Sequence, residues 1–179
     1  LEAIWRAENQ AFDNENWNTA IYGDSLGLYD GFLRASEEYE GYVGGKLAQY
    51  NLGISYLNSK EYTLAIETLE RVNFEDELLG TITLGAIGDA FLQLGSVNDA
   101  LENYERAYSR KENELTTPIY LMKAALCLEI LEDYEMAISL YRDIMQKYPL
   151  SSVANNAEKY MESLLLGKPV YQFEKEVLE

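Results

Sequence analysis

Acidic side chains are the most numerous chemically active groups in this chain, and they gather at two places. The run Glu75-Asp76-Glu77 and the run from Asp13 to Asn16 offer oxygen ligands of the kind that Ca²⁺ takes. A dedicated calcium loop also needs alternating oxygen ligands, a central glycine and a glutamate at its twelfth position, and neither run has them. Both runs are predicted to be solvated turns, and no metal site is expected.

The chain lacks the residues on which most hydrolytic sites depend. It has no histidine, the usual general base near neutral pH and a common zinc ligand. No carboxylate pair stands in an apolar setting that would raise its pKa for acid–base work. The single cysteine, Cys127, lies in the apolar run KAALCLEIL and is expected to be buried and structural. No catalytic residue is predicted, and an enzyme acting on carbohydrate or peptide is the least favoured of three functional classes.

Patterns for binding phosphate or nucleic acid are also absent. Gly41, Gly44 and Gly45 lie close together, but no G-x-x-x-x-G-K-[ST] loop occurs, so no nucleotide or other cofactor is expected. The 14 basic and 31 acidic residues give a net charge of −17, which repels nucleic-acid phosphates and anionic lipid headgroups. This acidic composition excludes nucleic acid as a partner and favours a protein partner with basic or apolar segments.

Apolar residues recur every three or four positions from Lys46 onward, which predicts pairs of short helices. In Gly88–Tyr108, for example, two such patterns are separated by Gly95. One helix pair of this size cannot bury both of its apolar faces, so neighbouring copies are expected. The copies share a spacing of 12 residues between two small residues: Gly53 to Ala65, Gly88 to Ala100 and Ala125 to Ala137.

The pattern resembles the tetratricopeptide repeat, a helix pair with a period of about 34 residues. The positions that carry the resemblance are Leu52-Gly53-Tyr56-Ala65-Leu69, Ile87-Gly88-Phe91-Ala100-Tyr104 and Ala124-Ala125-Leu128-Ala137-Tyr141-Pro149. The resemblance implies an all-α, right-handed solenoid of antiparallel helix pairs. It implies one domain, with a degenerate repeat and glycine-rich insertion at 1–45, repeats at about 46–79, 80–115 and 116–149, a capping helix at 150–166 and a tail at 167–179.

A narrower resemblance bears on where the protein acts. The runs GKLAQYNLGISYLNSKEYTLAIETL, LGAIGDAFLQLG, TPIYLMKAALCLE and YPLSSVANNAEKYM are similar to those of bacterial envelope proteins related to the tetratricopeptide ancillary subunit of the Sec translocon. Those proteins carry an N-terminal membrane helix and expose their repeats to the periplasm. The resemblance therefore implies a membrane anchor upstream and a periplasm-facing location, which would explain why the chain starts at Leu1 rather than at Met; the cytoplasm is the alternative.

The resemblance also implies that the first helix of each repeat lines a concave groove for a partner segment. These positions carry none of the basic residues with which chaperone-binding members clamp a peptide's terminal carboxylate. We expect a non-enzymatic protein-binding module that supports envelope translocation or assembly; a self-associating scaffold is the alternative. Because helix phase is uncertain by about two residues, core packing stays open for each candidate. The candidates are Tyr50, Ile54, Leu57, Asn58, Leu84, Asp89, Leu92, Gln93, Met122, Leu126, Glu129 and Ile130.

Overall fold

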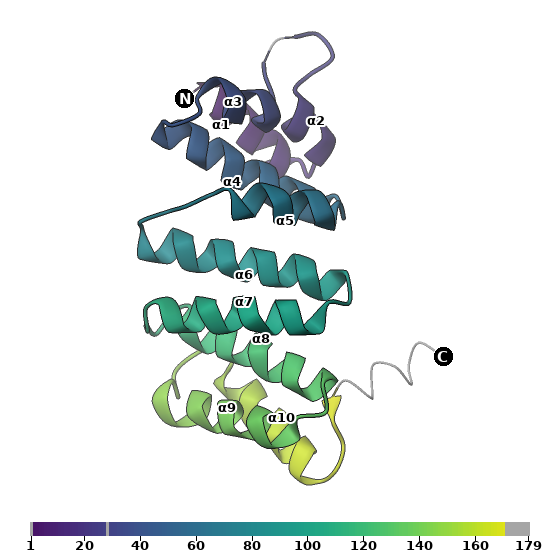
Figure 1. The fold of residues 1–179 in the computed structure, drawn as a ribbon, viewed down its shortest axis with the longest axis vertical. Helices are drawn as coiled ribbons and strands as arrows, with labels where there is room; N and C mark the ends of the chain where they lie inside the picture. The colour runs from purple at the N-terminus through teal and green to yellow at the C-terminus, as the bar shows by residue number, and fades with distance from the viewer. Residues whose placement is uncertain (1, 28, 171–179) are drawn as a thin grey trace, which may run out of the picture. The chain divides into compact units, whose positions relative to one another are not determined.

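The structure is a computed structural model that describes residues 2–27 and 29–170. Over these residues the chain forms helices joined by turns, and it contains no strand (Figure 1). The all-α prediction is therefore confirmed. The contacts divide the chain into two compact units, Leu1–Leu94 (unit 1) and Gly95–Glu179 (unit 2). No helix in the part of the chain that the structure describes is long and apolar enough to cross a membrane.

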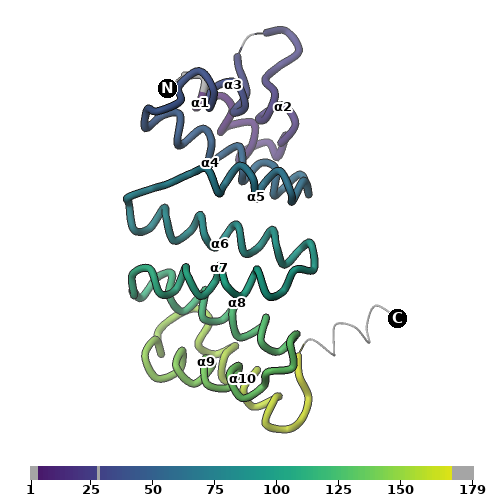
Figure 2. The backbone as a smooth tube through the Cα atoms, viewed as in Figure 1, coloured from purple at the N-terminus to yellow at the C-terminus, as the bar shows by residue number. Residues whose placement is uncertain are grey.

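Unit 1 begins with short helices and ends with longer ones. Its helices are α1 (Glu2–Glu8), the π-helical turn η1 (Asn9–Asp13), α2 (Trp17–Tyr22), α3 (Phe32–Glu38), α4 (Val43–Asn58), α5 (Tyr62–Glu70) and α6 (Glu77–Gln93). The helix α4 contacts α2, α3, α5 and α6, so it is the central element of this unit. Unit 2 consists of α7 (Val97–Arg110), α8 (Thr117–Ile130), α9 (Tyr134–Lys147) and α10 (Ala154–Leu165), each packed on the next along the chain (Figure 2).

The turn between the two helices of each repeat has the same backbone geometry. Seven positions after the small residue of the first helix, the backbone is left-handed at Lys60 (φ 64°), Gly95 (φ 78°) and Glu132 (φ 62°). Such a residue ends a helix by turning its amide back toward the last carbonyls. The N–H of Lys60 donates to the Leu57 carbonyl at 3.1 Å, and that of Glu132 donates to the Glu129 carbonyl at 3.0 Å. The three repeats predicted from residue spacing thus also share a left-handed backbone conformation at the same position.

The core of unit 1 depends on a close approach between α4 and α5. Gly53 lies opposite Leu69, which is fully buried. A Cβ atom built on Gly53 would stand 2.5 Å from Cγ and 2.6 Å from Cδ2 of Leu69. Leu69 therefore fills the space that a side chain at position 53 would occupy.

The core of unit 2 contains fully buried aromatic side chains. Tyr141 of α9 is fully buried and meets Tyr160 of α10 edge to face, with ring centroids 6.1 Å apart. Tyr104 and Tyr120 stack with their centroids 6.3 Å apart. Cys127 is buried, which confirms its predicted place in the core.

Candidate interaction surfaces

The residues predicted to line a groove in unit 1 lie at or near the surface of α4 and α6. On α4, Tyr50, Ile54 and Leu57 are half-buried and pack against the core with part of each side chain left accessible. Their spacing of four and three residues puts them on one face of the helix. On α6, Leu84, Asp89 and Leu92 are likewise half-buried. The helices that carry these two rows, α4 and α6, contact each other.

Two exposed amides stand at the ends of these helices. The Asn58 side chain donates a hydrogen bond through Nδ2 to the Ile54 carbonyl at 2.8 Å. The Gln93 side chain accepts one at Oε1 from the Tyr62 hydroxyl at 3.3 Å. Both amides are exposed, so they remain open to further hydrogen bonds from a bound segment.

The predicted groove residues of unit 2 have a different environment. Leu126 and Ile130 are half-buried, whereas Met122 is 7 % exposed and Glu129 is 2 % exposed. Met122 and Glu129 were expected at the groove surface, and the structure corrects this: their side chains are not available to a partner. Met122 packs into the unit 2 core.

Glu129 is buried because its carboxylate forms hydrogen bonds within unit 2. Its Oε1 accepts a hydrogen bond from the Tyr141 hydroxyl at 2.5 Å, and its Oε2 accepts one from the Val170 amide at 2.9 Å. Burial, together with the hydrogen bond and the charge of this carboxylate, raises the pKa of Tyr141 far above its usual value. The tyrosine therefore stays protonated and serves as a donor, and the contact ties the segment after α10 to α8.

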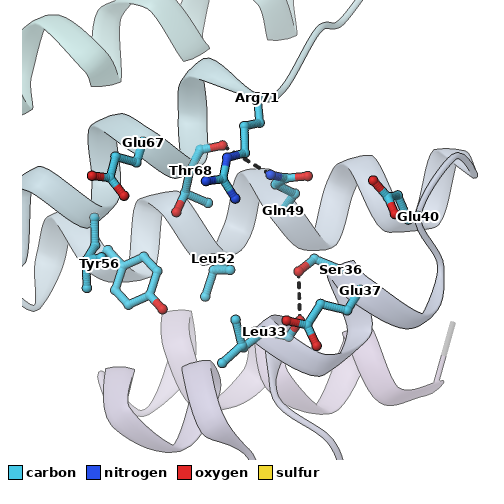
Figure 3. A pocket seen from close by; sticks show the side chains of 11 residues that line it. Leu33, Ser36, Glu37, Glu40, Gln49, Leu52, Tyr56, Glu67, Thr68 and Arg71 are labelled. Atoms are coloured by element: carbon cyan, nitrogen blue, oxygen red, sulfur yellow. Dashed lines mark hydrogen bonds between the residues drawn. The ribbon is translucent and has the colours of Figure 1, made fainter.

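A groove that the sequence analysis did not anticipate lies between α3 and α5, over α4 (Figure 3). Its volume is about 480 Å³, and we call it the α3–α5 groove. It is lined by Leu33, Ser36, Glu37 and Glu40 from α3 and the turn after it, by Gln49, Leu52 and Tyr56 from α4, and by Leu64, Glu67, Thr68 and Arg71 from α5 and its end. None of the predicted contact residues is among them.

Hydrogen bonds within unit 1 hold the walls of the α3–α5 groove in place. The Gln49 amide of α4 donates through Nε2 to the Thr68 carbonyl of α5 at 3.4 Å, and the Ser36 hydroxyl donates to the Leu33 carbonyl at 2.8 Å (Figure 3). Burial, followed by the charge of Tyr22 and a hydrogen bond with it, raises the pKa of Tyr56. The Tyr56 hydroxyl is therefore a neutral group at ordinary pH. Sequence spacing could not show this groove, because its walls come from separate helices.

An open depression of about 560 Å³ lies in unit 2 beside Tyr148. The Tyr148 hydroxyl donates to Oε1 of Glu112 at 2.6 Å. Burial and this hydrogen bond raise the pKa of Tyr148 to about 12. Lys147, which also lines the depression, pairs with Asp143 at 2.8 Å. Among the residues that the structure describes, no group of three or more His, Cys, Asp or Glu side chains could hold a metal ion.

Comparison with known families identifies the repeated unit. Two models of the tetratricopeptide repeat match the chain, one over residues 47–73 and the other over residues 86–152. The first match spans α4 after its first turn and the whole of α5, and the second spans the second half of α6 and all of α7, α8 and α9. No curated protein matches the chain. Together with the all-helical architecture, these matches confirm the predicted helical-repeat fold.

Proposed function

We propose that this tetratricopeptide-repeat protein is a non-enzymatic module that holds a segment of a partner protein against the first helices of its repeats. Such repeats generally bind proteins, and the support specific to this chain is the half-buried apolar row Tyr50, Ile54 and Leu57 on α4. A partner that covered this row would remove apolar surface from water, at about 25 cal/mol per Å². A second row of half-buried residues, Leu84, Asp89 and Leu92, lies on α6, which contacts α4.

The two exposed amides give this surface a means of orienting a partner. Asn58 and Gln93 follow the apolar rows on α4 and α6. Side-chain amides can donate to and accept from the backbone of an extended or helical segment. Apolar burial would then supply the affinity, and the amides would fix the direction of the bound segment.

Site-specific photo-crosslinking tests the proposal. A benzophenone amino acid at position 58 or 93 is expected to give an adduct with one discrete protein, and Leu57→Arg or Leu92→Arg is expected to abolish it. The control carries the same probe at Leu150, which is 97 % exposed and lies far along the sequence from this surface. Equal labelling from position 150, or binding of a small molecule instead of a protein, would contradict the proposal.

The location that we propose is the bacterial envelope, with the repeats facing the periplasm behind an upstream membrane anchor and with a role in protein translocation or assembly. The support is the likeness of four residue runs to envelope tetratricopeptide proteins. Protease treatment of spheroplasts that carry the full gene product is expected to degrade the repeats from outside. Protection of the repeats until the cells are lysed would favour the cytoplasm.

A self-associating scaffold is the second candidate function. It is favoured by large exposed apolar side chains in the first half of unit 1, among them Trp5 at 64 %, Tyr42 at 72 % and Val43 at 75 % exposed. Light scattering at increasing protein concentration separates the two candidates. A mass that rises with concentration and returns to the monomer value in Tyr42→Ser/Val43→Ser supports the scaffold, and a constant monomer mass removes it.

A further inference from the structure

The geometry points to a second binding site in unit 1: the α3–α5 groove takes a basic segment of a partner protein, with an arginine whose neighbour in the segment is apolar. This site is separate from the surface proposed above. The groove uses Gln49, Leu52 and Tyr56 of α4, whereas the proposed surface uses positions 50, 54 and 57. At 100° per residue these two sets lie on different faces of the helix, so one could be occupied without the other.

The groove has an apolar part formed by three leucines. Leu52 is buried beneath it, Leu33 is half-buried, and Leu64 is exposed beside it. The volume of about 480 Å³ falls within the range of about 300–1,000 Å³ that is typical of ligand sites. The aliphatic stem of an arginine can lie along such leucines while its charged end stays near water.

The charges around the groove decide which kind of ligand it can take. Among the described residues that line it, Glu37, Glu40 and Glu67 are negative and Arg71 is the one cation, so three negative charges less one positive charge leave a net of −2. Within the described residues, these three glutamates make no side-chain hydrogen bond or ion pair. Their carboxylates are thus available to a guanidinium, which binds carboxylates with two parallel hydrogen bonds.

Other ligand classes fit the same groove less well. An anion would be repelled by the net charge, and a neutral apolar ligand would leave the carboxylates unused. A metal ion is disfavoured because the described residues contain no group of three or more His, Cys, Asp or Glu that could hold one. A basic segment uses both the leucines and the carboxylates.

Fluorescence anisotropy with a designed probe tests the assignment. The probe is a fluorescein-labelled peptide of alternating arginine and leucine, and a second peptide carries citrulline at each arginine. The full chain is expected to bind the arginine peptide, more weakly as NaCl is raised, and the citrulline peptide at least about tenfold more weakly. Equal binding of both peptides would overturn the proposal.

Because the whole chain carries a charge of −17, a charge-matched control is essential. Glu37→Gln/Glu40→Gln/Glu67→Gln is expected to weaken binding about tenfold or more, and Glu70→Gln/Glu75→Gln/Glu102→Gln, which alters three exposed glutamates outside the groove, less than about threefold. Equal losses in the two triple variants would show attraction by overall charge alone and would overturn the site.

Two single substitutions in the groove should act in opposite directions. Arg71→Gln removes the competing cation and is expected to tighten binding about threefold, and Leu64→Arg places a guanidinium beside the carboxylates and is expected to weaken it about tenfold. Circular dichroism verifies that each variant is folded. Leu57→Arg, which alters the surface of the proposed function, should leave peptide binding unchanged, so the two proposals can fail separately.

Discussion

The α4–α5 pair of unit 1 and the α8–α9 pair of unit 2 are copies of one repeat, and two of the register positions at which they differ change the packing. Four and sixteen residues after the small residue, the first pair has Leu57 and Leu69, and the second has Glu129 and Tyr141. In unit 1 the first of these positions is half-buried and apolar. In unit 2 it is a buried carboxylate that binds a tyrosine hydroxyl and the amide of Val170.

This difference shows that the position of a residue within the repeat does not by itself decide whether its side chain is accessible to solvent. Leu57 and Glu129 occupy the same place in the repeat, yet only Leu57 keeps accessible surface. The reason is the segment after α10, whose Val170 amide reaches back to α8 across 41 positions of sequence. We therefore leave Met122 and Glu129 out of the proposed partner surface, whose apolar row Tyr50, Ile54 and Leu57 lies in unit 1.

The largest expected effect comes from truncating the second register position in each pair. Tyr141→Ala should lower the free energy of unfolding by about 4 kcal/mol and Leu69→Ala by about 3 kcal/mol, because both side chains are fully buried. The tyrosine costs more since its loss also leaves Glu129 with one partner fewer. Urea unfolding followed by circular dichroism at 222 nm measures both.

The control for these truncations is Leu150→Ala, which removes an exposed leucine and should change the free energy of unfolding by less than about 0.5 kcal/mol. If Leu69→Ala destabilised the protein more than Tyr141→Ala, the hydrogen bond to Glu129 would contribute nothing measurable. The two helix pairs would then differ in how their side chains pack and not in the energy of a hydrogen bond.

A double-mutant cycle in unit 2 isolates the polar contact. Tyr141→Phe should cost about 2 kcal/mol, because it leaves a buried carboxylate with one donor fewer. Adding Glu129→Leu gives unit 2 an apolar residue at the position of Leu57 and should recover about 1 kcal/mol or more. Urea unfolding of the four proteins gives the coupling energy. Strict additivity would mean that the tyrosine and the glutamate are not energetically coupled.

A smaller effect is expected at the close approach in unit 1. Gly53→Ala forces a methyl group against Leu69, which costs about 1–3 kcal/mol, while the better helix propensity of alanine returns about 1 kcal/mol. The expected net loss is about 1 kcal/mol. Gly44→Ala in the same helix is the matched control, because its added Cβ would meet only Ile4 Cδ1 at an ordinary 3.7 Å. A shift of the thermal midpoint downward for Gly53→Ala and upward for Gly44→Ala is expected, and equal shifts would contradict the steric account.

An effect confined to alkaline pH is expected in unit 2. In the folded state the pKa of Tyr148 is raised to about 12, whereas the unfolded value is about 10. The folded state therefore holds a proton that the unfolded chain releases, so this contribution to stability is complete below about pH 10 and is lost as the pH rises toward 12. Tyr148→Phe should flatten the fall in urea midpoint above pH 10, and Leu150→Ala should not. The same slope in the wild type and Tyr148→Phe would contradict the raised pKa.

Local spacing was enough to predict the repeats, because helix pairing within a repeat joins residues only 12 to 16 positions apart. The predicted burial of Cys127 is confirmed, and Gly53, a position in the repeat pattern, lies against Leu69 of the second helix. The sequence did not predict the α3–α5 groove, because its glutamates come from separate helices. The spacing of apolar residues within one helix does not show which helices lie side by side. The burial of Glu129 was missed for a similar reason, since its partner at Val170 lies outside the repeat pattern.

Sequence by itself determined that this chain is all-helical, that its helices pair in repeats that match tetratricopeptide models, and which small and large residues hold the register positions of each repeat. These features depend on helix periodicity and on contacts close in sequence, which residue types encode directly. Only the tertiary structure decided which faces remain accessible. Solvent exposure depends on every segment that packs over a position, and a residue type such as glutamate is compatible both with an open groove at position 37 and with a buried hydrogen bond at position 129.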